Sequence, residues 1–363
     1  MGRSPFLARI GQLQNRLQLN QCLLLSRRSD LLYFSSFVAN VPEERSAFLL
    51  ITAKEAHLLL QNFLPKPNNF PGLVSHGFTS PDRLVAYLTS LIEKTGINSL
   101  QIDQGDLRVD EFQSLKKIPN LHVDTLNRQL IWQLRSQKDR AELAKISKAR
   151  QVTKRVLAEA ISQLKVGQTE LEVARLIDNK IRTQADCELA FPSIIAFDEN
   201  SALPHHQPSH KKLHHGSVVL IDIGATYKHY CADMTRTIFW RQSDQAETNQ
   251  IKRKATKFAK IDKLVKDAYK KGFDLLHASQ TCSAAELDLA CRDFLTSAGY
   301  GQKFIHTTGH GLGLDIHEPP SIWKNNSAPL LPGMTITIEP GVYLPGEFGV
   351  RFENTVLVKK KHF

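Results

Sequence analysis

The stretch IDIGATYKHYCADMTRT, residues 221–237, decides how the second half of the chain folds. Val218, Leu220 and Asp222 fall on one strand face by period-two spacing, which predicts a strand with Asp222 at its end. Gly224 is expected to let the chain turn tightly, and Asp233 then lies on the antiparallel return. Two carboxylates in one partly buried site repel each other unless a cation lies between them. The stretch therefore predicts a β-hairpin with part of a metal site; two exposed or turn-capping acids are the alternative.

Two further segments supply the remaining candidate ligands. FIHTTGHGLGLDIHEPP, residues 304–320, holds three histidines between glycines that let the backbone approach a ligand closely. These histidines are His306, His310 and His317. Glu339 ends an apolar strand and Glu353 interrupts another apolar run, so each is expected to be buried beside a metal or an arginine.

Four carboxylates and one imidazole are enough donors for two adjacent divalent ions about 3.5–4 Å apart, which activate water for hydrolysis. The sequence therefore predicts a dinuclear metallohydrolase. Its candidate ligands are Asp222, Asp233, His310, Glu339 and Glu353.

Composition describes a globular chain of 363 residues, 42% hydrophobic and 23% charged, with room for two domains. The N-terminal residues lack the apolar core and cleavage site of a secretory signal, and no segment is long enough to span a bilayer. Five cysteines without paired CxxC spacing favour reduced thiols. We therefore expect a cytoplasmic protein without a membrane partner.

The net charge of +11 raises the alternative of nucleic-acid binding. The densest basic run is IKRKATKFAKIDKLVKDAYKKG, residues 251–272, in which apolar residues recur at helical spacing and lysines fill the remaining positions. This pattern is typical of a surface helix with a solvated face. Without aromatic platforms or zinc-finger spacing, nucleic acid is not the expected partner.

The chain is predicted to be α/β (α+β) with two domains, residues 1–132 and 133–363. The first alternates short apolar runs (CLLLS, LLYFSS, AFLLIT, AHLLL, NSLQID) with helical stretches, which predicts a small α/β domain. A long amphipathic helix over residues 135–164 then opens the second. Gly167 is expected to end this helix, and Thr169 with Glu172 forms a capping box for the next.

Five motifs in this order resemble the metallopeptidase family with the pita-bread fold, most closely its proline-specific branch of Xaa-Pro aminopeptidases and Xaa-Pro dipeptidases (prolidases). They are FPSIIAFDENSALPHH, IDIGATYKHYCADMTRT, HTTGHGLGLDIHEPP, MTITIEPGVY and GVRFENT. The first third resembles the creatinase-type N-terminal domain, with DLLYFSSF in place of the usual Tyr-Leu-Thr-Gly-Phe run. The resemblance implies a creatinase-like domain followed by a pita-bread catalytic domain.

The resemblance also implies roles for individual residues. Asp222 binds one metal, Asp233 and Glu353 bridge both, and His310 with Glu339 completes the second ion. The metals of the family are manganese, cobalt or zinc, and the oxygen-rich ligand set favours manganese. Catalytic roles fall to His205, His317 and Glu339, with Glu339 assisting proton transfer. Substrate contacts fall to His205, His306, His317 and Arg351.

Other residues near the motifs receive lesser roles. Tyr343 is a candidate for the pocket wall. The four remaining histidines of the loop after FPSIIAF are expected to be solvated; they are His206, His210, His214 and His215.

The expected substrate is a peptide with proline in second position, cleaved before the proline by an Xaa-Pro aminopeptidase. A dipeptidase restricted to Xaa-Pro is the main alternative, and access around the site decides between them. Methionine aminopeptidase and a non-catalytic binding protein on the same fold are more remote alternatives. Relatives in this family commonly dimerise, which implies a homodimer.

Overall fold

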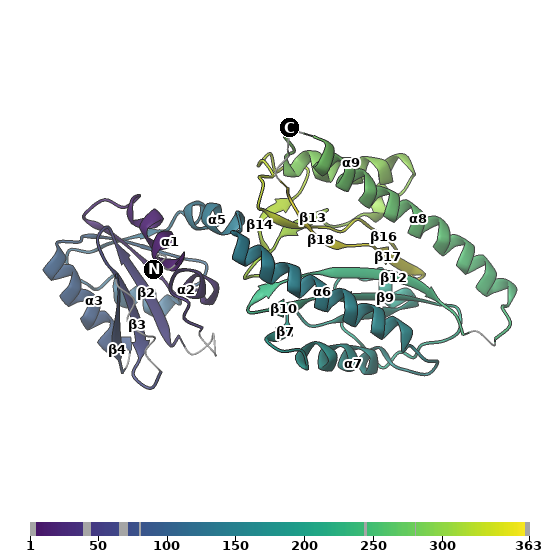
Figure 1. Ribbon diagram of the computed structural model, residues 1–363, viewed down its shortest axis with the longest axis horizontal. Coiled ribbons are helices and arrows are strands. Elements are labelled where there is room, and N and C mark those ends of the chain that lie inside the picture. Colours follow the sequence, from purple (N-terminus) through teal and green to yellow (C-terminus); the bar gives the residue numbers. More distant parts are fainter. Residues whose placement is uncertain are drawn as a thin grey trace. The chain divides into compact units, whose positions relative to one another are not determined.

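The computed structural model describes residues 5–38, 45–64, 72–79, 81–242, 245–279 and 281–359. The chain divides into two compact units, Met1–Arg135 and Ser136–Phe363, called here the N-terminal and C-terminal units (Figure 1). This division falls within helix α5 (Gln129–Ser136), the same helix that contains the predicted boundary after residue 132.

The N-terminal unit is built on a six-stranded sheet with the strand order β4-β3-β2-β1-β5-β6. Strands β1, β5 and β6 are parallel to one another, whereas β2 runs antiparallel to both β1 and β3. The strands are β1 (Gln21–Leu25), β2 (Ala47–Thr52), β3 (Ala56–Gln61), β4 (Leu73–Phe78), β5 (Ser99–Ile102) and β6 (His122–Thr125). The other helices are α1 (Pro5–Gln14), α2 (Arg28–Ser35), α3 (Pro81–Thr95) and α4 (Val109–Leu115).

One apolar run of this unit forms a helix where a strand was expected. LLYFSS lies largely in α2, where Leu31, Tyr33 and Phe34 are buried. A short helix that is buried on most sides has no polar face, so its sequence reads like a buried strand. The runs CLLLS, AFLLIT, AHLLL and NSLQID do contain strands, as predicted.

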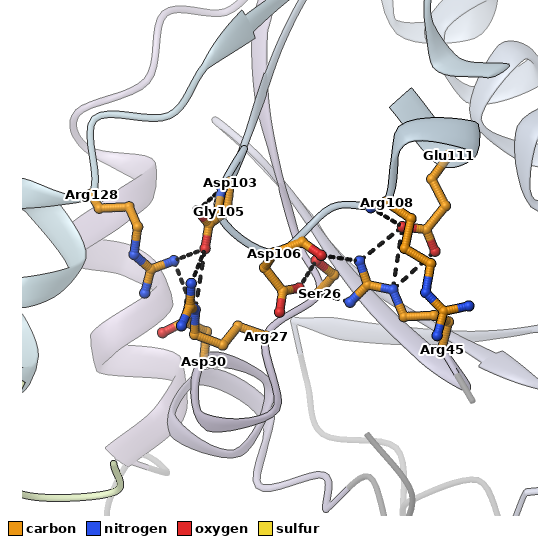
Figure 2. Close-up of polar contacts among 10 residues, drawn as sticks. All are labelled: Ser26, Arg27, Asp30, Arg45, Asp103, Gly105, Asp106, Arg108, Glu111 and Arg128. Carbon is orange, nitrogen blue, oxygen red and sulfur yellow. Dashed lines mark hydrogen bonds and ion pairs between the residues drawn. The ribbon is translucent and has the colours of Figure 1, made fainter. Parts of the chain in front are cut away.

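Ion pairs cross-link the loops that follow the parallel strands β1, β5 and β6 (Figure 2). Arg128, after β6, contacts Asp30 at 2.9 Å and Asp103 at 2.5 Å, and Arg27, after β1, contacts Asp103 at 3.1 Å. Arg135 Nη1 also lies 2.9 Å from Asp30 Oδ1, with both side chains only 1% exposed. Asp30 is therefore a buried carboxylate held between two guanidinium groups.

A second group of polar contacts lies beside the first in the same unit (Figure 2). Arg45 forms ion pairs with Asp106 at 2.7 Å and Glu111 at 2.8 Å. The hydroxyl of Ser26 donates to Asp106 at 2.5 Å. These contacts tie the end of β1 to the loop before α4.

The C-terminal unit packs pairs of helices against several small sheets. Its sheet orders are β12-β9-β8, β11-β10-β7, β14-β13-β15-β18 and β16-β17. The helices are α6 (Arg140–Ser162), α7 (Glu170–Arg182), α8 (Asn249–Ala278) and α9 (Ala284–Ser297). The strands are β7 (Cys187–Leu189), β8 (Ile194–Phe197), β9 (Ser217–Ile223), β10 (Ala225–Tyr227), β11 (Tyr230–Cys231), β12 (Met234–Trp240), β13 (Gly309–Gly311), β14 (Glu318–Ile322), β15 (Thr335–Ile338), β16 (Gly341–Leu344), β17 (Phe348–Arg351) and β18 (Asn354–Leu357).

Two large hydrophobic cores among the described residues hold this unit together. Helices α6 and α7 pack with β8, β9 and β12 in one core. Helices α8 and α9 pack with β15 to β18 in the other. Figure 1 shows α8 and α9 on the side of the unit opposite α7. The fold is the mixed α/β class that the sequence predicts.

The predicted hairpin of residues 221–237 is present but more elaborate than expected. Strands β9 and β12 pair antiparallel, while β10 and β11 between them form their own two-residue turn at Lys228 and His229, both with positive φ. Gly224 is required for close packing and not for the turn, because a Cβ there would lie 2.4 Å from the carbonyl oxygen of Ala232. The tight turn therefore falls where the sequence shows no glycine.

One of the two predicted capping signals is confirmed. Thr169 and Glu172 form the predicted capping box of α7. The prediction that Gly167 ends the preceding helix is wrong, because α6 ends at Ser162 with Gln163 as its C-cap, and Gly167 lies beyond it with a φ of 86°. The single helix expected over residues 135–164 is instead interrupted, because Asp139 caps α6 by accepting from the backbone of Glu142 at 2.8 Å. The basic helix α8 buries Phe258, Ile261 and Val265 on its apolar face, as predicted. Among the described residues, no helix meets the length and apolarity needed to cross a membrane.

The buried position of Asp30 leads to a stability prediction. Asp30→Asn removes a buried carboxylate that contacts both Arg128 and Arg135, which costs roughly 3–5 kcal/mol in the free energy of unfolding. Asp267→Asn is the matched control, because Asp267 pairs with Lys263 on the exposed face of α8 and exposed pairs contribute about 1 kcal/mol or less. Urea unfolding followed by circular dichroism measures both variants. Equal stability of the two variants would contradict the prediction.

Candidate metal centre

One cavity of about 650 Å³ in the C-terminal unit is lined by all nine predicted site residues. They are His205, Asp222, Asp233, His306, His310, His317, Glu339, Arg351 and Glu353. Residues that are as far apart in the sequence as His205 and Glu353 thus meet in one cavity. The catalytic, substrate-binding and metal-binding roles of these residues stay predictions. Their distances, hydrogen bonds and charges indicate which chemistry the cavity supports.

The four acids lie at the ends of strands that meet at the cavity. Asp222 lies in β9, and Asp233 directly precedes β12, the antiparallel partner of β9. Glu339 directly follows β15, and Glu353 directly precedes β18, the antiparallel partner of β15. Each antiparallel pair therefore contributes one carboxylate from each of its two strands. The apolar residues of these strands fix the acids in place because they are buried.

His310 faces this group of acids with an unprotonated nitrogen. Its Nδ1 lies 3.1 Å from the carbonyl of Gly311, which can only accept, so Nδ1 carries the hydrogen and donates. Its Nε2 lies 3.4 Å from Glu339 Oε1 and 3.7 Å from Asp233 Oδ2. A lone pair directed at carboxylate oxygens is unfavourable unless a cation lies between them. Ligand atoms of Asp233, His310 and Glu353 all lie within 4.8 Å of one another.

The electrostatics of the acids also favour a cation. Burial, and after it the neighbouring carboxylates, raises the pKa of Asp233 and Glu353 well above the usual range. One oxygen each of Asp222, Asp233 and Glu353 is buried and accepts no hydrogen bond from the residues that the structure describes. Buried carboxylate oxygens without donors are costly unless a metal binds them. The donor set therefore fits divalent metal ions.

Threonine hydroxyls orient two of the acids. Thr235 Oγ1 donates to Glu353 Oε2 at 2.6 Å, and Thr337 Oγ1 donates to Glu339 Oε1 at 3.0 Å. Such partners fix the direction in which a ligand presents its free oxygen. Neither threonine was predicted from the sequence. One sequence feature does point to Thr337 as a partner of Glu339: it precedes Glu339 by two positions, the spacing that places two residues on one strand face.

Arg351 neutralises part of the cluster. Its Nη2 donates to Asp222 Oδ2 at 2.6 Å, its Nε to Thr235 Oγ1 at 3.1 Å, and its Nη1 to the hydroxyl of Tyr343 at 2.8 Å. The Arg351 side chain is only 3% exposed. All three of its nitrogen atoms thus donate to protein groups, so its expected contact with a substrate stays a prediction.

His306 is held in one tautomer by its neighbours. Arginine only donates, so the Tyr343 oxygen accepts from Arg351 and directs its own hydrogen to His306 Nε2, 2.8 Å away. His306 Nδ1 then carries the ring's hydrogen and donates to the carbonyl of Thr307 at 2.7 Å. Burial lowers the pKa of His306, which agrees with this neutral form. Both ring nitrogens therefore have protein partners.

His205 and His317 are the accessible histidines of the cavity, since both residues are exposed. His317 directly precedes β14, and its ring meets the His310 ring edge-on with centroids 4.4 Å apart. These positions allow both histidines to contact a bound molecule beside the acids.

A buried glutamate holds the loop that carries His205. Glu170, at the start of α7, is completely buried and accepts from the backbone of Phe197 at 2.7 Å and from the hydroxyl of Ser209 at 2.6 Å. It also pairs with His206 Nε2 at 2.8 Å. The prediction that His206 is solvated is therefore wrong, because a buried carboxylate recruits it as a partner. His210 and His214 are exposed, as predicted. His215 is not solvated as predicted, because it is half-buried and its Nδ1 accepts from the backbone of Gln242 at 3.0 Å.

The glycines between the histidines serve strand packing, and their expected role in the approach to a ligand stays a prediction. A Cβ at Gly309 would lie 2.1 Å from the carbonyl oxygen of Thr337. A Cβ at Gly311 would lie 2.5 Å from the carbonyl oxygen of Pro319. Both glycines thus let β13 lie close to its neighbouring strands and bring His310 to the acids.

Comparison with known proteins assigns the family. The sequence model of the family described as metallopeptidase family M24 matches residues 144–360 of this chain. An uncharacterized peptidase of Staphylococcus haemolyticus is 33% identical over 339 residues, 91% of this chain and 90% of that protein. A Xaa-Pro dipeptidase of Pyrococcus horikoshii is 35% identical over 265 residues, 73% of this chain and 72% of that protein.

Solved structures give the same result. The crystal structure of an X-Pro aminopeptidase from Thermotoga maritima MSB8 matches with a TM-score of 0.81 and 27% identity, covering 96% of this chain and 95% of that one. This likeness, and the family match over most of the C-terminal unit, confirm the pita-bread fold and the resemblance to the proline-specific branch. The chain belongs to metallopeptidase family M24.

Proposed function

We propose that this chain is a metal-dependent Xaa-Pro aminopeptidase, which removes an N-terminal residue from a peptide whose second residue is proline. The observation that carries the proposal is the meeting of three buried carboxylates, the partly buried Glu339 and the unprotonated Nε2 of His310 in one cavity. Relatives named Xaa-Pro aminopeptidase and Xaa-Pro dipeptidase support the substrate class.

The charges of the cluster support two divalent ions. Once metal binding has displaced their protons, four carboxylates and the guanidinium of Arg351 leave three negative charges, which one divalent ion does not neutralise and two do. We assign the ions to Asp222, Asp233, His310, Glu339 and Glu353. Such ions supply Lewis acidity and lower the pKa of bound water. Because most of these donors are oxygens, manganese is the proposed metal, with cobalt or zinc as alternatives.

The remaining polar groups suit the hydrolysis of a bond to proline. We assign Glu339 to assist proton transfer to the leaving nitrogen, because it lies among the metal-binding acids in the cavity and burial raises its pKa above the usual range. The proline nitrogen, like every amide nitrogen, must gain a proton to leave as an amine. His205 and His317, exposed in the cavity, are placed to donate hydrogen bonds to the substrate and its developing oxyanion.

The size of the cavity supports an aminopeptidase over a dipeptidase. At about 650 Å³ it lies well within the range of sites for drug-sized molecules, so residues beyond the proline have room. A dipeptidase is the second candidate, because the Pyrococcus horikoshii relative at 35% identity bears that name.

Two further assignments complete the proposal. The N-terminal unit is assigned as the creatinase-type domain, supported by its six-stranded mixed sheet and by relatives that match over most of the chain. We place the enzyme in the cytoplasm, because its five cysteines are buried and form no disulfide in the part of the chain that the structure describes, as in a reducing compartment.

A peptide panel tests the substrate class directly. With Mn²⁺ restored after chelation, we expect kcat/KM for Ala-Pro-Yaa tripeptides to exceed that for Ala-Pro by roughly tenfold or more, since additional residues add contacts in the cavity. Amino-acid release measures each reaction.

The controls of the panel separate the alternatives. Cleavage of Ala-Pro alone would identify a dipeptidase. Cleavage of Met-Ala-Ser without any proline substrate would identify a methionine aminopeptidase. Absence of all cleavage with metal bound would leave a non-catalytic binding protein.

The raised pKa values of the acids predict an unusual effect of Glu353→Gln on stability. A raised pKa in the folded state means that the folded protein keeps a proton that the unfolded chain releases above pH about 4. This contribution to stability is complete below that pH and is lost as pH rises through the folded pKa. Metal-free Glu353→Gln should therefore melt above metal-free wild type, by about 2–4 °C per kcal/mol, with a difference that grows from pH 5 to pH 8.

Addition of Mn²⁺ should reverse this order. The wild type gains stability by binding the metal, while Glu353→Gln lacks one ligand charge and gains less. Scanning calorimetry with and without Mn²⁺ at both pH values measures the effect. A metal-free Glu353→Gln variant that melts below the wild type at pH 8 would refute the electrostatic explanation.

A further inference from the structure

We propose that Asp288 and Arg292, an ion pair on α9, position His306 for the reaction. Neither residue lines the cavity, and neither was singled out by the sequence analysis. The pair spans one helical turn, at i and i+4, so both side chains leave the same face of α9. That face meets the segment 304–308, which carries His306 into the cavity. The effect on catalysis rests on the proposed function, whereas the effect on the position of His306 does not.

Asp288 holds the far end of this segment. It is completely buried, and its Oδ1 accepts from the backbone of Thr308 at 3.2 Å and from the Thr308 hydroxyl at 2.7 Å. The carbonyl of Thr308 in turn accepts from the backbone of Glu339 at 2.8 Å. Asp288 is therefore connected to a candidate metal ligand through a single residue.

Arg292 holds the near end of the same segment. Its Nη1 donates to the carbonyl of Phe304 at 3.0 Å, and its Nη2 donates to the carbonyl of His306 at 2.8 Å. The guanidinium carbon also lies 4.3 Å from the centre of the Phe304 ring and 4.8 Å from that of Trp323. Backbone on both sides of His306 is thus fixed from one helix.

The guanidinium group is specifically suited to this role. Besides the two carbonyls, Arg292 makes a bidentate contact with Asp288, through Nε at 2.8 Å and Nη2 at 2.9 Å. Only the planar fork of arginine can donate to a carboxylate and two carbonyls at once while stacking between aromatic rings. A lysine at this position keeps the charge but loses this geometry.

The position of the segment determines the hydrogen bonds of the His306 ring. One partner of the ring, the Thr307 carbonyl, moves with the segment, whereas the other, the Tyr343 hydroxyl, belongs to β16. A shift of the segment therefore breaks the bond from Tyr343 and releases the fixed tautomer. The α9 ion pair acts on the reaction through His306 and is a positioning pair, since it does not touch the cavity.

Kinetics of Arg292→Lys and Asp288→Asn test the effect on the reaction. Misplacement of a site residue by about 1 Å can cost on the order of a hundredfold, so we expect kcat/KM on Ala-Pro-Yaa to fall roughly tenfold to a hundredfold. Val173→Ala is the control for lost stability, because Val173 is buried in the core of α6 and α7, away from this segment. The control should keep its activity when folded.

A double-mutant cycle tests whether His306 transmits the effect. In a His306→Ala background, Arg292→Lys should lower kcat/KM by no more than about twofold further, because the group that it positions is gone. An equal loss in both backgrounds would overturn the proposal, as would full activity of Arg292→Lys in the wild-type background.

Histidine-ring NMR gives a readout that needs no peptidase activity. In ¹⁵N-histidine protein, the signals missing from His306→Ala identify His306, and Arg292→Lys should shift or broaden them. His277, bonded to the carbonyl of Phe273 on α8, should keep its signals. Unchanged His306 signals would overturn the proposal whatever the activity. Shifted signals in a protein that cleaves no Xaa-Pro peptide would uphold the positioning pair and reject the proposed function instead.

Discussion

Mutual repulsion among four carboxylates, three of them buried and the fourth partly buried, is the constraint on which the rest of the C-terminal unit depends. Asp222, Asp233, Glu339 and Glu353 line one cavity, and the pKa of three of them is raised by burial. Without cations, this arrangement opposes folding. The two hydrophobic cores and the paired strands that end at the cavity must therefore supply the stability that the site removes.

The surroundings of the acids limit this cost without removing the site's capacity for metal. Arg351 neutralises one carboxylate, and threonine hydroxyls satisfy one oxygen on each of two others. Three carboxylate oxygens are still left without a donor among the described residues. Functional sites commonly contain such unsatisfied polar groups, and binding of the ligand then offsets their cost in the free energy of folding. The helices contribute at longer range, since α7 holds the loop of His205 and α9 holds the segment of His306.

Sequence reasoning succeeded where a local signal carried the information. Each candidate ligand is an acid at the end of an apolar strand or a histidine in a glycine-rich stretch, so pattern alone drew attention to all five. The capping box at Thr169 and the apolar face of α8 are likewise local, and both are confirmed. The fold class followed from the alternation of strand-like and helical segments, and the family comparison agrees.

What the sequence could not predict were the choices of distant partners. His206 reads as a solvated loop residue until Glu170, 36 positions away, is seen to be buried against it. Arg292 reads as an ordinary helix residue, because its contacts with Phe304 and His306 depend on how α9 packs. The turn at Lys228 and His229 was missed because neither residue is a glycine or an asparagine, the residues that usually mark a turn with positive φ. Periodicity reports which face of an element is buried, but not what it is buried against.

The number of metal ions bound per chain tests the central claim most directly. Metal-stripped protein should bind two Mn²⁺ ions per chain in a calorimetric titration at neutral pH, and elemental analysis after gel filtration should give the same ratio. Protons should be released on binding, because the pKa values of Asp233 and Glu353 are raised in the metal-free protein. Binding of no metal, or of a single ion without proton release, would contradict the view that this cavity is built around a pair of cations.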